Sequence, residues 1–136
     1  MRTAKRIFNL FLLTAIFTVI TVNAATPPEQ HDIQPRYTGV ASVMADLDIS
    51  SSGRASVYGN VRTIPGYTAS ITVSLRQDTG TSVKSWSSSG SGTITIDKIY
   101  YVATGHDYFT SVQVIAYNSS GTLVDSITVD SNVVSH

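Results

Sequence analysis

Apolar and polar residues alternate along most of the chain after residue 37. The first two runs place small or aliphatic residues at every second position: Val43, Ala45, Leu47 and Ile49, then Ala55, Val57, Gly59 and Val61. Successive side chains of a β-strand point to opposite faces, so this period of two predicts strands with one buried face. No helical apolar period persists in this region, and we therefore expect an all-β domain.

Further runs with the same alternation follow, separated by clusters of turn-forming residues. The inward positions of the later runs are Ala69, Ile71, Val73 and Leu75, then Val112, Val114 and Ala116, and finally Leu123, Ile127 and Val129. About seven short strands with turns roughly every 8 to 12 residues are typical of a β-sandwich. The pattern predicts a single antiparallel β-sandwich of the immunoglobulin or fibronectin III type, preceded by an N-terminal signal helix.

Three places break the alternation. Val83 and Trp86 are oddly spaced, which predicts a bulge or a sheet edge. Residues 87–92 (SSSGSG) predict a flexible connection. Lys98 interrupts an apolar face, so we expect a bulge or a change of register near Asp97-Lys98.

One corner carries a more specific signal. Residues 102–108, VATGHDY, resemble the stretch of fibronectin type III domains that reads Leu-x-Pro-Gly-Thr-x-Tyr and leads into the penultimate strand. Thr104 stands where that stretch has proline. The resemblance implies that Tyr108 is a corner tyrosine, with its ring in the core and its hydroxyl bonded to the backbone.

The N-terminus has the order of a secretory signal. A basic start is followed by a mostly apolar stretch over residues 7–22, and Val22-Asn23-Ala24 offers small residues where a signal peptidase cuts. The stretch is shorter than the ~20 residues of a membrane span, so cleavage after Ala24 is favoured over an uncleaved anchor. We expect a signal peptide at 1–24, a Pro-rich leader at 25–36, the sandwich at 37–132 and a tail at 133–136.

Composition narrows the setting and the partners. The chain has no cysteine, so a secreted form would rely on packing and sheet hydrogen bonds without disulfides. Without residues 1–24, six basic and nine acidic residues remain, a net charge of −3. No basic patch is present, which argues against nucleic acid, and no membrane partner is expected after signal cleavage. The predicted location is extracellular, free or at the cell surface.

The tripeptide Asp78-Thr79-Gly80 matches the spelling around the catalytic carboxylate of aspartic proteases. Such an enzyme needs two of these carboxylates facing each other on buried loops, each after a strongly apolar strand. Here the polar pair Arg76-Gln77 precedes Asp78. We favour a hairpin turn in which Asp78 caps the turn and Gly80 takes a positive φ, with an aspartic-type peptidase as the minor alternative.

Other catalytic and metal sites have weak support. His106 and Asp107 are adjacent, and no Gly-x-Ser-x-Gly elbow occurs, so no catalytic residue and no cofactor is predicted. Asp46 and Asp48 lie two apart on one strand, and with Asp130 they could supply oxygen ligands to Ca²⁺. The alternative is a solvated strand face.

A ligand surface is the stronger hypothesis. Phe109, Ile115 and Tyr117 fall on the outer face of the longest strand, and Tyr58 of another strand is a candidate fourth member. Exposed aromatic residues on a sheet are typical of contact sites. The predicted function is a non-catalytic extracellular contact with a protein or with itself, or a structural role. The alternative is carbohydrate or cell-wall binding.

Several short stretches match in order along the domain: residues 37–39, 47–55, 59–61, Trp86, 100–102 and 117–121. In these stretches the chain resembles an uncharacterised family of small secreted proteins of Gram-positive bacteria, a domain of unknown function. The resemblance implies secretion and brings no activity with it.

Overall fold

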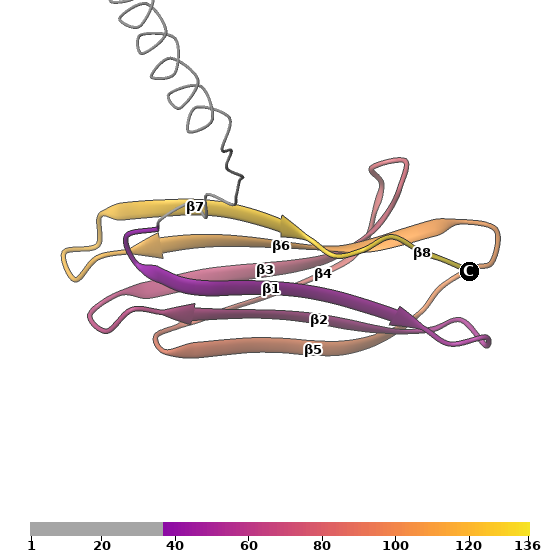
Figure 1. The fold of residues 1–136 in the computed structure, drawn as a ribbon, viewed down its shortest axis with the longest axis horizontal. Coiled ribbons are helices and arrows are strands. Elements are labelled where there is room, and N and C mark those ends of the chain that lie inside the picture. The colour runs from indigo at the N-terminus through magenta and orange to yellow at the C-terminus, as the bar shows by residue number, and fades with distance from the viewer. Residues whose placement is uncertain (1–36) are drawn as a thin grey trace, which may run out of the picture. The chain divides into compact units, whose positions relative to one another are not determined.

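The alternating runs become eight antiparallel strands in the computed structural model, which describes residues 37–136 (Figure 1). The strands are β1 (Val40–Ile49), β2 (Arg54–Thr63), β3 (Thr68–Gln77), β4 (Ser82–Gly90), β5 (Thr93–Tyr101), β6 (Asp107–Tyr117), β7 (Leu123–Asp130) and β8 (Val134–Ser135). This region contains no helix, and none that could cross a membrane. The expected signal peptide and leader lie outside the described residues.

Two sheets form the layers of a β-sandwich. Sheet A has the order β1-β2-β5, and sheet B has the order β4-β3-β6-β7, with β8 pairing to β6. The fourth strand therefore joins the sheet of β3, whereas in constant-type immunoglobulin domains it belongs to the other sheet. The predicted all-β, immunoglobulin- or fibronectin III-like sandwich is confirmed.

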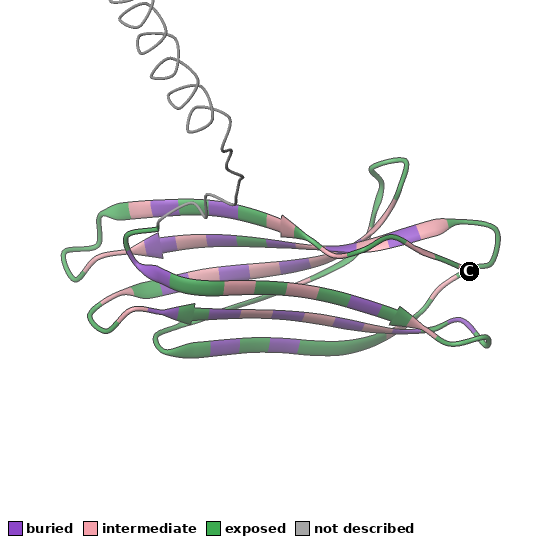
Figure 2. Ribbon diagram, viewed as in Figure 1, coloured by how far each residue is buried: buried purple, intermediate pink, exposed green. Residues whose placement is uncertain are grey.

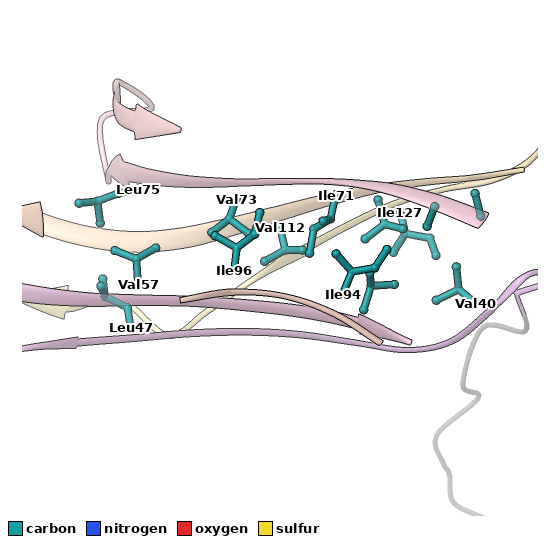
Figure 3. Close-up of a cluster of buried hydrophobic side chains, with 14 of the residues drawn as sticks. Val40, Leu47, Val57, Ile71, Val73, Leu75, Ile94, Ile96, Val112 and Ile127 are labelled. Carbon is teal, nitrogen blue, oxygen red and sulfur yellow. The ribbon is translucent and has the colours of Figure 1, made fainter. Parts of the chain in front are cut away.

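The core lies between the sheets and contains most of the predicted inward positions, together with Val40, Ile94 and Ile96 (Figure 3). Buried and less buried residues alternate along β2, β3 and β6 (Figure 2). Fully enclosing each Val, Leu or Ile side chain contributes about 1.5–3 kcal/mol. These contacts and the strand ladders hold a domain that has no disulfide.

Gly59 lets the two sheets approach each other. It occupies an inward position of β2, where a Cβ atom would lie 2.8 Å from Cγ2 of Val112 and closer still to Cγ2 of Val73. Both valines belong to sheet B. A glycine in a strand interior marks a close approach of this kind.

The corner tyrosine is confirmed. Tyr108 is only 1% exposed, and its hydroxyl donates a hydrogen bond to the carbonyl oxygen of Ala103 at 2.8 Å. The ring fills the core near the start of β6, and the hydrogen bond holds the loop that leads into that strand.

Four local predictions are wrong. Residues 87–90 belong to β4 and are not a flexible connection. Lys98 pairs with Val57 without a register shift, and as part of an edge strand it reaches solvent. Leu123 is 53% exposed because a bulge near Tyr117 turns it outward. Residues 133–136 are not a tail, since β8 pairs with the start of β6. The bulge expected near Val83 is present, on an edge strand.

Candidate functional site

Asp78 lies in a hairpin turn between β3 and β4. The amide of Gly80 donates to the carbonyl of Gln77, and the amide of Gln77 donates to the carbonyl of Thr81, both at 2.9 Å. Gly80 has a φ of 96°. These features match a three-residue hairpin loop with a left-handed third residue.

The same turn occurs twice more in the domain. Residues 50–54 and 118–122 close with the same pair of backbone hydrogen bonds, and Gly53 and Gly121 take the left-handed position. Asp78 therefore has the same loop position as Ser51 and Ser119, and it is exposed instead of being held in a buried cleft. The turn prediction is confirmed, with Gly80 at a positive φ. The side chain that bonds the turn is Arg76, which donates to the carbonyl of Gly80.

The three candidate calcium ligands do not come together. Asp46 and Asp48 share the outer face of sheet A, as expected from their spacing. Asp130 pairs with Ser111 on sheet B, whose outer face points the opposite way. Within residues 37–136, no group of three or more His, Cys, Asp or Glu side chains could hold a metal ion.

The four candidate ligand-binding residues are also divided. Phe109, Ile115 and Tyr117 lie on the outer face of sheet B, whereas Tyr58 lies on the outer face of sheet A. Phe109 and Ile115 are six positions apart along β6, which is about 20 Å at the rise of a strand. Only Ile115 and Tyr117 remain neighbours, so the predicted aromatic patch does not exist as one surface.

The structure gives Tyr58 different neighbours. Asp46 of β1 and Asp97 of β5 are its direct cross-strand partners on the two sides. Met44 and Ile99 occupy diagonal positions, which lie within reach of long side chains. Tyr101 follows Ile99 on the same face of β5. We call these six residues the Tyr58 face.

The Tyr58 face combines exposed apolar groups with carboxylates. Met44 is 56% exposed, Ile99 48% and Tyr101 66%, and they account for half of the large hydrophobic residues exposed among residues 37–136. Asn60, beside Tyr58 on β2, donates a hydrogen bond from Nδ2 to Oγ1 of Thr95 at 2.7 Å. The face therefore offers an aromatic centre, apolar flanks and hydrogen-bonding side chains together.

Sequence reasoning found Tyr58 and Asp46 but missed the other members of the face: Met44, Asp97, Ile99 and Tyr101. The outward direction of Met44 and Asp97 follows from the alternation, so that signal was available. Ile99 and Tyr101 come after the register change that was expected near Asp97-Lys98, which would have reversed their direction. What was missing is the strand order β1-β2-β5, which makes residues about 40 positions apart into neighbours.

The outer face of sheet B has a different character. Ser85, Ser87 and Ser89 of β4 lie beside Ser70, Thr72 and Ser74 of β3. Their hydroxyls bond one another, at 3.1 Å between Thr72 and Ser87 and at 2.8 Å between Ser74 and Ser85. This part of the sheet is uncharged and rich in hydroxyl groups, and it presents no aromatic centre.

Comparisons with known proteins add little. No family model matches the chain, and no curated protein matches it. A candidate beta-galactosidase from Bacteroides fragilis is structurally similar, with 14% sequence identity and a TM-score of 0.42. The match covers 65% of this chain and 15% of that protein. This likeness does not bear on function, and the resemblance to a family of small secreted proteins stays a prediction.

Proposed function

We propose that the chain is a secreted, non-catalytic module that contacts another protein outside the cell through the Tyr58 face. The observation that carries this proposal is the gathering of Met44, Tyr58, Ile99 and Tyr101 on one face of sheet A. Tyrosine, methionine and arginine are enriched at protein interfaces, and aromatic anchors near the centre supply much of the binding energy.

The surroundings of the face support a protein partner. Arg54 lies beside Tyr101, and Arg62 lies near the other end of β2, so charged residues border the apolar diagonal. An apolar centre with a polar rim is the usual anatomy of an interface. The N-terminal export pattern supports a partner outside the cell.

Binding to cells of the source organism tests the proposal. Labelled chain should bind the cell surface, and the double variant Tyr58→Ser, Tyr101→Ser should bind at least tenfold more weakly. The matched control is Ser74→Ala with Ser111→Ala, on the outer face of sheet B. Protease treatment of the cells should remove the binding. Equal loss in both double variants would contradict a role for the Tyr58 face.

Carbohydrate binding is the second candidate, favoured by one observation. Asp46, Tyr58 and Asp97 form a single row across the three strands of sheet A. An aromatic ring between two carboxylates can stack against a sugar ring while the carboxylates accept hydrogen bonds from its hydroxyls. Binding that survives protease treatment and is competed by soluble cell-wall fragments would favour this function over a protein partner.

A further inference from the structure

β4 is an edge strand. Its backbone N–H and C=O groups that point away from β3 have no strand partner within residues 37–136. It pairs with β3 on one side only, and it does not pair with β5, which belongs to the other sheet and contacts β4 through Tyr100 against Trp86. Unpaired edges can pair with another strand, so natural sheets protect them with charges, prolines, bulges or short strands.

The other edges of the sandwich carry such protection. β1 has a register shift at its start and the pair Asp46 and Asp48. β5 has the adjacent charges Asp97 and Lys98. β7 has a bulge near its start and ends at Asp130.

β4 is protected at its beginning only. Its bulge is at Val83, and Lys84 is its single charge. From Ser85 to Gly90 the strand is regular, uncharged and free of proline, with the sequence SWSSSG. Serine and glycine side chains are too small to block an incoming strand.

We propose that β4 pairs antiparallel with β4 of a second copy of this chain, which extends sheet B across two molecules. The favoured register is centred on Ser87, because that centre uses the whole bulge-free stretch from Lys84 to Gly90. Ser87 then faces Ser87 of the second copy, Trp86 faces Ser88, and Lys84 faces Gly90.

This register is compatible with a two-fold axis. A contact between two identical patches must tolerate its own residues, and here the one charge faces a glycine instead of its own copy. The backbone groups of the two strands satisfy each other, as in other strand-addition complexes. The serine hydroxyl rows on the outer face continue across the junction.

Trp86 reports on the contact. It is the only tryptophan of the chain, is half-buried on the inner side of β4, and packs edge-on against Tyr100 at a centroid distance of 6.4 Å. A second β4 alongside would cover more of its indole. Its emission should therefore shift to shorter wavelength as the protein concentration rises.

The test uses the chain in the form that its host produces and measures its mass by sedimentation over a range of concentrations. The unsubstituted chain should form dimers. Ser87→Lys places two lysines opposite each other at the axis and should weaken the dimer about fivefold or more. Ser87→Asp should do the same, and an equal mixture of the two variants should restore dimers because lysine then faces aspartate.

Thr128→Lys is the matched control, because exposed Thr128 lies in the same cross-strand row as Ser87, on the opposite edge strand of sheet B. It should leave the dimer unchanged. At concentrations low enough for the unsubstituted chain to be monomeric, thermal unfolding of each variant should match that of the unsubstituted chain, which shows that the fold is retained.

Disulfide trapping provides an independent readout. The chain has no cysteine, so Ser87→Cys should give an oxidised dimer and Thr128→Cys should not. Cα atoms opposite each other in an antiparallel pair are about 4.5–5.5 Å apart, within disulfide range. A mass of one chain at every concentration would overturn the proposal. So would a dimer unaffected by Ser87→Lys, or a failure of the mixture to restore it.

Discussion

At the residue scale, Tyr108 shows how one side chain serves both core and loop. Its ring is buried among aliphatic residues, while its hydroxyl reaches the carbonyl of Ala103. The local sequence made this role predictable, because the tyrosine stands in a fixed position after a Gly-containing corner. Thr104 in place of proline did not disturb the arrangement.

Tyr108→Phe keeps the ring and removes the hydrogen bond. We expect a loss of about 1 kcal/mol in the free energy of unfolding, because the carbonyl of Ala103 loses its buried donor. Urea denaturation followed by Trp86 fluorescence measures this loss. Tyr58→Phe, on the outer face of sheet A, is the control and should change stability very little.

Gly59 is a position where any side chain would force the two sheets to rearrange. Gly59→Ala should lower the free energy of unfolding by about 1–3 kcal/mol, because the new methyl would overlap Val73 and Val112. Gly90→Ala is the matched control, since a Cβ there meets only Ile94 at an ordinary 3.9 Å. Equal effects of the two substitutions in thermal unfolding would contradict the close approach of the sheets.

At the scale of elements, the repeated hairpin turn explains the Asp-Thr-Gly tripeptide. Two loops that read Ser-Ser-Gly and one that reads Asp-Thr-Gly close in the same way, and each has glycine at the left-handed position. The conformation therefore depends on the glycine, and the residue at the first loop position is free to vary. The protease-like spelling arises from turn chemistry.

The turn interpretation predicts opposite sensitivities for two neighbouring residues. Gly80→Ala should cost about 1–2 kcal/mol, because an L-residue is strained at a φ of 96°. Asp78→Asn should stay within about 0.5 kcal/mol, as for other surface substitutions. Thermal unfolding measures both. Peptide cleavage at acid pH that disappears in Asp78→Asn would contradict the turn interpretation.

The second half of β4 was predicted to be a flexible connection, but it is a strand. Its serine- and glycine-rich second half lacks apolar alternation because it is an edge strand that buries little. Its amino-acid composition is therefore similar to that of a loop. Pairing with β3 supplies the backbone hydrogen bonds that keep this segment extended.

At the scale of the whole molecule, the two sheets are joined by contacts between distant segments. The buried carboxylate of Asp125 in β7 accepts hydrogen bonds from the amides of Thr38 at 3.0 Å and Gly39 at 2.7 Å. It thereby ties sheet B to the segment that enters β1 of sheet A. No local pattern in the sequence indicated this role.

Asp125→Ala should lower the free energy of unfolding by about 2 kcal/mol, because it leaves two amides without their charged acceptor. Hydrogen exchange at Thr38 and Gly39 should become faster, while exchange in the middle of β3 follows only the global change. Asp130→Ala, an exposed aspartate of the same strand, is the control. Unchanged exchange at both amides would show that the carboxylate does not hold this segment.

The candidate site also depends on the fold of the whole molecule. The alternation shows which residues point away from the core, and it does so correctly for Tyr58, Phe109 and Tyr117. It does not show which sheet each strand joins. The Tyr58 face and the separation of Asp130 from Asp46 both follow from the strand order of the two sheets.

The all-β class, most of the inward positions, the turns and the corner tyrosine were predictable from the sequence, because they depend on backbone preferences and side-chain direction over a few residues. Only the pairing and packing of the strands in the folded chain show which outward residues share a face, where the sheets touch at Gly59, what Asp125 binds and which strand edges stay unpaired. These features depend on pairing between segments far apart in the chain, and a period of two is the same whichever strand lies alongside.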